Sequence, residues 1–345
     1  MIGAGPVKRK LVTMADVAKE ANVSITTVSH VLNQTATISP ATTERILAAV
    51  QKLDYSPRQS VKAAKTNGKR IIGILAPDIA NEFYARCIQS ACEEAWRQDY
   101  ITVICGTRHD QRTEIKYVKY LIKDGICGLI LIGGLLDEKY IVEASSKVPV
   151  VLGDRYLLSH PVSSVITDNI SAMRRLIEKL AKAGYKRIGY ISEDLGMSNV
   201  QDRYMGYKTG LEENGLPFLQ EHVHFSASLR LDKIETAHQF VQAQILTRPA
   251  LPEVFVCTSD LIAAGVLAAM LEAGYRVPRD IGVVGFDDIM LAAYTRPPLT
   301  TIAQNMHQLG KNCLTVLSQQ IEGQDRSTRQ IVVNAKLVMR ESVKM

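Results

Sequence analysis

The apolar positions of residues 13–32 recur at helical spacing in two short segments, with a break at Asn22. Thr13 is placed to cap the first segment, and Asp16 is the reciprocal partner expected in a capping box. Ser24 is placed to cap the second segment. The pattern therefore predicts two short helices joined by a tight turn.

A third helix is predicted at residues 40–53. Ser39 is its expected N-cap, and Pro40 takes the first helical position, where its missing N–H is not needed. Its apolar stripe is expected to contain Ile46, Leu47, Val50 and Leu53. Two helices joined by a tight turn and braced by a third form a helix-turn-helix unit. An ordinary three-helix bundle with a polar face is the alternative.

The second helix carries short hydroxyl side chains where a solvated helix normally carries Glu and Lys. Val28 can face inward, whereas the side chains left facing outward are Ser24, Thr26, Thr27, Ser29 and His30. Hydroxyl groups donate hydrogen bonds to phosphate oxygens without filling the groove of DNA. This face is therefore typical of a helix that reads DNA.

From residue 70 onward, short apolar strands alternate with helices. The strands are expected at 71–77, 100–106, 127–133, 149–154 and 163–168, and then at 187–192, 222–226, 253–259 and 280–288. The helices are expected at 82–98, 111–123, 170–183, 202–214, 232–246 and 260–273. This rhythm predicts two successive doubly wound units with parallel sheets, and hence two lobes.

The last part of the chain is expected to connect the lobes. Residues 299–304 look like a strand crossing between them, a helix follows at 306–322, and the tail at 331–342 alternates as an edge strand would. We expect a helix-turn-helix domain at 11–56, a linker at 57–69 and a body at 70–345. Lobe 1 is expected to take 70–166 and 302–328, and lobe 2 to take 167–300 and 329–345.

Charge is concentrated at the start of the chain. Residues 1–70 contain eleven Lys or Arg and four Asp or Glu, an excess of seven positive charges, while the whole chain of 345 residues carries +6. The remaining 275 residues therefore carry −1. A basic head on a nearly neutral body is the electrostatic footprint of nucleic-acid binding.

Other classes of protein lack positive signals. No run of eighteen apolar residues predicts a membrane span, and the first ten residues do not resemble a signal peptide. Six cysteines without paired or zinc-type spacing are expected to be free thiols in the cytoplasm. No dinucleotide fingerprint, P-loop or nucleophile elbow is present. We therefore expect no catalytic role, no cofactor and no bound metal.

The run TMADVAKEANVSITTVSHVLN at residues 13–33 resembles the opening of the lactose/galactose repressor (LacI/GalR) family. Further matches occur at Pro77-Asp78-Ile79, at 165–169, at Ser259-Asp260 and at 283–301, so the resemblance covers residues 13–345. It implies a helix-turn-helix head and a body whose two lobes are of the periplasmic-binding-protein type.

The resemblance also implies a DNA-reading role for the head and the linker. The residues expected at the DNA are Thr13, Ser24, Ile25, Thr26, Thr27, Ser29, His30, Asn33, Tyr55, Lys62 and Ala64. Ile25 can read a thymine methyl group, and His30 takes a position where many members carry Arg. In the family the linker is a hinge that wedges a leucine into the minor groove. Ala64 stands at that position and is too short to act as a full wedge.

Polar residues at the carboxyl ends of the predicted strands mark the expected ligand cleft. The residues expected at the effector are Asp78, Asn81, Phe83, Tyr84, Arg108, Asp154, Arg203, Ser259 and Asp287. By resemblance, Asp154, Arg203 and Asp287 match positions that hold effector hydroxyls or carboxylates. Ser259 departs from the family, where many members carry Asn.

These observations lead us to expect a cytoplasmic, homodimeric regulator of transcription, most simply a repressor, that binds operator DNA and a small sugar or sugar derivative. A non-sugar effector or a protein corepressor is the alternative within this class. A solute-binding protein is a further alternative, which the basic head disfavours.

Overall fold

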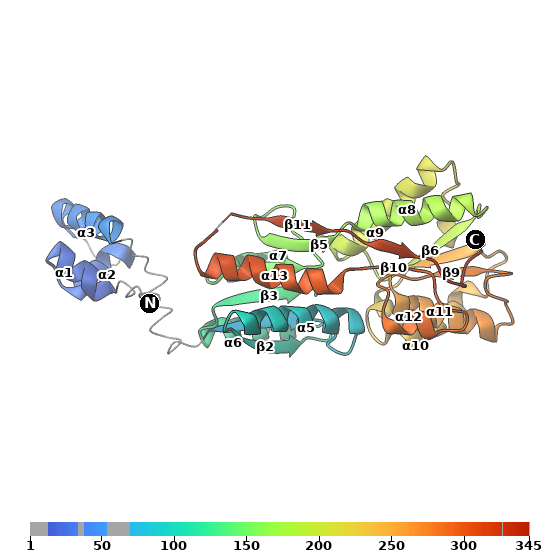
Figure 1. Cartoon of the computed structure of the whole chain (residues 1–345), viewed down its shortest axis with the longest axis horizontal. Helices are drawn as coiled ribbons and strands as arrows, with labels where there is room; N and C mark the ends of the chain where they lie inside the picture. Colours follow the sequence, from blue (N-terminus) through green and yellow to red (C-terminus); the bar gives the residue numbers. More distant parts are fainter. Residues whose placement is uncertain (1–12, 34–37, 54–69, 326, 345) are drawn as a thin grey trace, which may run out of the picture. The chain divides into compact units, whose positions relative to one another are not determined.

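The computed structural model describes residues 13–33, 38–53, 70–325 and 327–344. The chain divides between Arg70 and Ile71 into two compact units, which we call the head and the body (Figure 1). Tyr55, Lys62 and Ala64 lie outside the described residues, as does the linker expected at 57–69. Their DNA contacts remain predictions.

The head consists of three helices, α1 Met14–Ala21, α2 Ile25–Asn33 and α3 Pro40–Lys52. The predicted capping box of α1 is present: Thr13 and Asp16 each bond the backbone N–H of the other. Ser39 caps α3 by accepting a hydrogen bond from the N–H of Thr42. Each short helix therefore has local bonds that satisfy its first N–H groups.

The small core of the head lies where the three helices meet. Its buried side chains are Val17, Ala18, Ala21, Val28, Ile46 and Ala49. The expectation for Leu47 is wrong, because that side chain is half exposed. The stripe on α3 follows the spacing of Ile46, Ala49, Val50 and Leu53, and Leu47 lies about 100° away from Ile46 on this helix.

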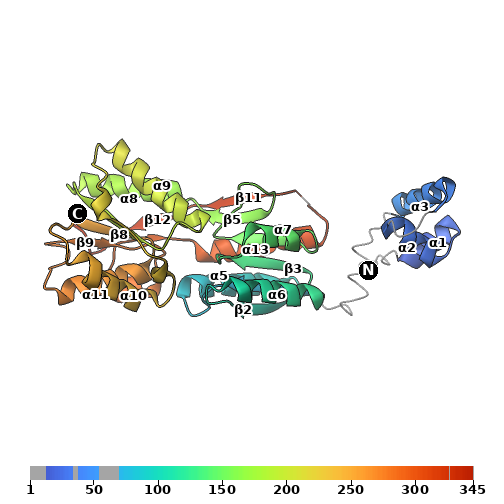
Figure 2. The ribbon, with the colours of Figure 1, turned by 180° about the vertical axis from the view of Figure 1, so that it is seen from behind.

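Lobe 1 of the body is built on a six-stranded parallel sheet in the order β11-β5-β4-β3-β1-β2. Its strands are β1 Ile71–Ala76, β2 Ile101–Gly106, β3 Gly128–Ile132, β4 Val150–Gly153, β5 Ser163–Thr167 and β11 Gln330–Val333. Its helices are α5 Glu82–Arg97, α6 Gln111–Lys123, α7 Glu138–Ser145 and α13 Met306–Ile321. Helices α5 and α13 pack together on one face, and α6 and α7 cover the other (Figures 1 and 2).

Lobe 2 is built on a four-stranded parallel sheet in the order β7-β6-β8-β9. Its strands are β6 Ile188–Ser192, β7 Val223–Phe225, β8 Val254–Cys257 and β9 Gly282–Val284. Its helices are α8 Asn169–Lys182, α9 Ser198–Glu213, α10 Lys233–Phe240, α11 Asp260–Glu272 and α12 Met290–Tyr294, and a π-helical turn, Val241–Ile245, continues α10. The pair α8 and α9 covers one face, and α10 and α11 cover the other (Figure 2).

Three segments cross between the lobes. The first joins β5 to α8, the second contains β10 Thr301–Ala303 and leads into α13, and the third joins β11 to β12 Lys336–Val338. Strands β10 and β12 pair antiparallel at the junction. The predicted crossing strand at 299–304 is therefore present.

The tail of the chain corrects the expected boundary between the lobes. Residues 329–345 were expected in lobe 2, but Gln330–Val333 pairs with β5 in the sheet of lobe 1. The alternating tail is two strands, which belong to different sheets and are separated by Asn334-Ala335. Alternation predicts extended structure but does not identify the partner strand.

None of the helices in the described part of the chain is long and apolar enough to cross a membrane.

Candidate functional site

Strand ends from both lobes bring polar side chains together at the junction. Asp154 follows β4 of lobe 1, whereas Glu193, Thr258 and Asp287 follow β6, β8 and β9 of lobe 2. The backbones of Asp154 and Asp287 have positive φ angles, 55° and 120°. All four residues are buried. The carboxyl ends of parallel strands are where open α/β sheets bind their ligands.

Asp154 is a buried carboxylate with one well-bonded oxygen. Asn199, on α9 of the opposite lobe, donates to its Oδ2 at 2.6 Å. Its Oδ1 lies 3.8 Å from Nη2 of Arg203. Neither Oδ1 nor that Nη2 has a hydrogen-bond partner among the described residues. Burial raises the pKa of Asp154 to about 6, although Arg203 and Asn199 act in the opposite direction.

Arg203 is held in place by its other atoms. Its Nε donates to Asn169 Oδ1 at 2.9 Å, and its Nη1 donates to the carbonyl oxygen of Thr258 at 2.8 Å. The guanidinium carbon lies 3.9 Å from the centre of the Phe286 ring. The guanidinium therefore has a fixed position, and Nη2 is the nitrogen left to bind another group.

Asp287 joins this site to the crossing segments. Its Oδ1 accepts a hydrogen bond from Gln304 Nε2 at 2.7 Å, and Gln304 in turn accepts from the hydroxyl of Thr167. Thr167 ends β5 at the first crossing, and Gln304 follows β10 at the second. Burial raises the pKa of the Asp287 carboxyl, which Arg203 and Gln304 only partly offset. A group that binds Asp287 therefore acts directly on the junction of the lobes.

Tyr84 is an aromatic residue whose hydroxyl is influenced by these charges. It is buried in α5, in edge-to-face contact with Phe83 at 5.2 Å between ring centres. Burial and the charges of Asp154, Glu193 and Asp287 raise its pKa. Phe83 belongs to the core of lobe 1.

Other expected effector residues have local structural bonds. Asn81 caps α5 by accepting from the N–H of Phe83 at 3.0 Å, and Asp78 accepts from the N–H of Ala80 at 2.9 Å. Ser259 is buried and caps α11 by accepting from the N–H of Ile262 at 3.3 Å. These bonds explain the three residues without a ligand, so their effector contacts remain predictions.

At the end of β2 the structure favours a neighbour of the expected residue. The side chain of Arg108 is exposed, whereas His109 is half-buried and both of its ring nitrogens are buried. Burial and the nearby charge of Lys233 lower the pKa of His109 to about 4, so this imidazole is neutral at pH 7. Both residues have positive φ angles, 53° for Arg108 and 55° for His109.

Sequence reasoning missed a second buried pair in lobe 2. Lys233 Nζ lies 3.0 Å from Glu193 Oε1, and the hydroxyl of Thr258 donates to Glu193 Oε2 at 2.6 Å. Burial alone would raise the pKa of Glu193, but Lys233 and the Thr258 hydroxyl lower it to about 2. The acidic stretch ISEDLG is the signal in the sequence, although Lys233 is forty residues away from Glu193.

The head presents its polar helix as expected. In α2, Val28 is fully buried, Ser24, Ile25 and Thr26 are exposed, and Thr27, Ser29 and His30 are partly exposed. Ser24 Oγ accepts from the N–H of Thr27 at 3.1 Å, which confirms its capping position. Asn33 closes α2, and its side chain falls outside the described residues. The face available to DNA is therefore short-chained and polar, with Ile25 as its apolar member.

Comparison with known proteins decides the family. The model for bacterial regulatory proteins of the lacI family matches residues 13–58, and the model for a periplasmic binding protein-like domain matches residues 177–343. The HTH-type transcriptional repressor PurR of Haemophilus influenzae (strain PittEE) is 32% identical over 340 residues, which cover 97% of this chain and 99% of that protein. The chain belongs to the lacI family. The predicted family and fold class are therefore confirmed.

Two solved structures of transcription regulators with bound ligands are also similar to this chain. The transcriptional regulator CelR in complex with cellobiose is 25% identical, with a TM-score of 0.71 and coverage of 96% of this chain and 99% of that chain. The lac repressor dimer bound to operator and the anti-inducer ONPF is 26% identical, with a TM-score of 0.69 and coverage of 97% and 100%. The lacI fold therefore extends over both units of this chain.

Proposed function

We propose that this lacI-family protein represses transcription by binding operator DNA through α2, and that a small polyhydroxy effector between the lobes sets its affinity for DNA. The observation that carries the proposal is the contact of Asp154 with Arg203. Oδ1 of Asp154 and Nη2 of Arg203 come from different lobes, are buried, and have no hydrogen-bond partner among the described residues. Leaving buried polar atoms without a hydrogen bond costs free energy. A ligand that bonds them removes this cost, which favours binding.

A hydroxyl group suits this pair chemically. It can donate a hydrogen bond to Oδ1 of Asp154 and accept one from Nη2 of Arg203 at the same time. Since the two atoms are 3.8 Å apart, one ligand oxygen could lie within hydrogen-bond distance of both. The cellobiose complex of CelR supports a sugar as the ligand.

The bonds of Asp287 support coupling between the effector and DNA. Asp287 is bonded to Gln304, which is bonded to Thr167, so two crossing segments meet beside the site. An effector that bonds Asp287 favours one arrangement of the lobes over another. By linkage, the effector and operator DNA then change each other's affinity by the same factor.

An apolar edge of lobe 1 supports assembly into a homodimer. Strand β2 is the last strand of its sheet, and Ile101, Val103 and Ile104 are exposed along it. Trp96 of α5 is 81% exposed, and Tyr120 of α6 is 55% exposed. An exposed apolar face of this kind marks a protein interface. Two heads are also needed to read a two-fold operator, and the lac repressor bound to operator is a dimer.

PurR and the lac repressor are repressors, and we propose no catalytic role for this protein. We place the protein in the cytoplasm, where operator DNA is found.

The test is selection of operator sequences by the full chain from random duplex DNA, followed by titration of the selected complex with D-ribose, D-glucose and cellobiose. We expect one sugar to change operator affinity at least tenfold, and Arg203→Ala to abolish that change. Arg276→Ala is the matched control, because Arg276 is exposed and bonds only Asp280 in the described contacts. Failure of the chain to enrich any DNA sequence would refute the DNA-binding proposal.

A further inference from the structure

Glu193 and Lys233 form an ion pair at the junction of the lobes. Lys233 opens α10 and lies 3.0 Å from Glu193 Oε1. The side chains are 6% and 10% exposed for Glu193 and Lys233, so the pair is shielded from water. Glu193 also accepts the hydroxyl hydrogen of Thr258 at 2.6 Å. Its negative charge is therefore held firmly beside Lys233.

This pair faces the effector site. Lys233 acts electrostatically on Asp154 and Asp287, and both partners act on His109 of lobe 1. Burial is the largest cause of the raised pKa of Tyr84, and the charge of Glu193 raises this pKa further. Thr258 links the pair to the site, because its hydroxyl donates to Glu193 Oε2 at 2.6 Å and its carbonyl oxygen accepts from Nη1 of Arg203 at 2.8 Å. A ligand bonded to Arg203 therefore lies close enough to the pair to experience its charges.

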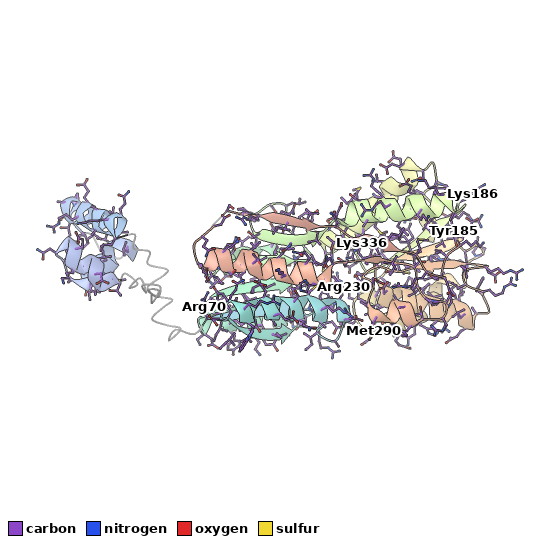
Figure 3. The ribbon with its side chains drawn as sticks, viewed as in Figure 1. Arg70, Tyr185, Lys186, Arg230, Met290 and Lys336 are labelled. Atoms are coloured by element: carbon purple, nitrogen blue, oxygen red, sulfur yellow. The ribbon has the colours of Figure 1, made fainter. Side chains whose placement is uncertain are left out.

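Three cations at the junction have carboxylate partners in the described part of the chain. Arg203 lies beside Asp154, Lys233 beside Glu193, and Arg230 bonds Asp194. Figure 3 places Arg230 at the junction of the lobes. Asp287, in contrast, is bonded to the neutral amide of Gln304. His109 is neutral at pH 7 because burial lowers its pKa to about 4.

This balance of charge discriminates between classes of effector. A neutral polyol needs only donors and acceptors, which Asp154, Arg203 and Asp287 supply. A phosphate or carboxylate group would lose its hydration and meet cations whose charges are already neutralised. It would also lie near the carboxylates of Asp154 and Asp287. The free energy of binding therefore favours the uncharged molecule.

We propose that the Glu193–Lys233 pair determines effector specificity by charge, so that the cleft takes uncharged polyols and rejects their phosphorylated derivatives. Glu193 does so by neutralising Lys233, which would otherwise bind a phosphate group. The proposal rests on the proposed function, because it concerns the same effector site. It assigns to this pair a role that the Asp154 and Arg203 contacts do not supply.

The experiment uses inorganic phosphate as the probe and measures its binding to the full chain by calorimetry at pH 7. Glu193→Gln keeps the size of the side chain and removes its charge, which leaves Lys233 unneutralised. We expect this variant to bind phosphate about tenfold more tightly than wild type. Adding Lys233→Met to Glu193→Gln should remove the gain. Glu213→Gln is the control, because Glu213 is bonded to Arg174 at an exposed position. This variant also leaves a cation without its carboxylate partner and changes the net charge by the same amount as Glu193→Gln.

The outcomes separate this inference from the proposed function. Equal phosphate binding by wild type and Glu193→Gln would overturn the inference, as would a gain that survives Lys233→Met or appears equally in Glu213→Gln. The head is unchanged in all variants, so phosphate binding to its basic residues is the same in each and does not affect their comparison. The proposed function is judged separately, by whether a neutral sugar changes operator affinity in wild type.

Discussion

Two buried carboxylates, Asp154 of lobe 1 and Glu193 of lobe 2, lie at the same junction and each has a cation beside it. Glu193 bonds Lys233 at 3.0 Å and Thr258 at 2.6 Å, and its pKa is lowered to about 2. Asp154 lies 3.8 Å from Arg203 and keeps one oxygen unbonded among the described residues, and burial raises its pKa to about 6. Both carboxylates are buried, so the difference lies in the closer cation and the additional hydrogen bond of Glu193.

The comparison shows how a protein separates structural charge from binding charge. A carboxylate whose oxygens are already bonded within its own lobe stabilises that lobe and has little to offer a ligand. A carboxylate bonded loosely across two lobes costs free energy until another group bonds it. We therefore propose that the Asp154–Arg203 contact serves effector binding, whereas the Glu193–Lys233 pair serves stability and selectivity.

The largest expected effect concerns the residues that we propose bind the effector. Arg203→Ala and Asp287→Ala should each weaken effector binding by about a hundredfold or more, because each removes a charge-assisted hydrogen bond in a buried site. Operator affinity without effector should stay within about threefold of wild type, since the head is unaltered. Titration of the operator complex measures both quantities. If either variant responds at the wild-type effector concentration, that residue lies outside the site.

The next effect concerns the contribution of Glu193 to the free energy of unfolding. Glu193→Ala should lower the free energy of unfolding by about 3 kcal/mol, because it leaves Lys233 without its partner in a shielded position. Urea denaturation at pH 7 measures the loss. The pKa of Glu193 is lower in the folded than in the unfolded state, so its contribution is present above about pH 4.5 and is lost as pH falls toward 2. A deficit in Glu193→Ala that stays constant down to pH 3 would contradict this origin.

The same contrast explains which parts of the site the sequence predicts. Asp154 and Asp287 follow from strand ends, because the backbone of a doubly wound lobe puts such positions in one place. Arg203 lies on α9 and follows from the family resemblance. The pairing of Glu193 with Lys233 was not predictable, since the loop before α10 brings together residues far apart in sequence. The choice between Arg108 and His109 depends on one turn with positive φ angles, which two adjacent polar residues do not specify.

The limits of pattern reasoning in the fold have similar causes. The strand rhythm predicts both sheets, yet β11 belongs to lobe 1 because partner choice depends on where the third crossing passes. The short helices α7 and α12 were not predicted. Leu47 shows that an apolar residue in a helix does not mark the buried stripe by itself.

We expect a moderate effect of pH on effector binding, through the titration of Asp154. A hydroxyl group that donates to Asp154 favours the ionised carboxylate, whose pKa in the protein alone is about 6. Affinity should therefore be full above about pH 7 and fall as pH drops through 6, by at most about tenfold per pH unit for this group. Calorimetry between pH 5 and 8 measures the profile. Affinity that rises below pH 6 would show that the ligand bonds the protonated carboxyl instead.

The smallest effect concerns Ser259, a third buried residue at this junction and one that sequence reasoning assigned to the effector. Its hydroxyl oxygen already accepts the N–H of Ile262 at the start of α11, so it resembles Glu193 more than Asp154. Ser259→Ala should cost about 1 kcal/mol of stability through loss of the cap. Effector affinity should stay within about twofold, because the hydroxyl oxygen is committed to the helix. Ser259→Asn restores a capping side chain and should recover most of the stability. If Ser259→Ala instead weakens effector binding tenfold with unchanged stability, the Ser259 hydroxyl bonds the ligand. In that case, a satisfied hydrogen bond in the protein alone does not distinguish structural residues from binding residues at this site.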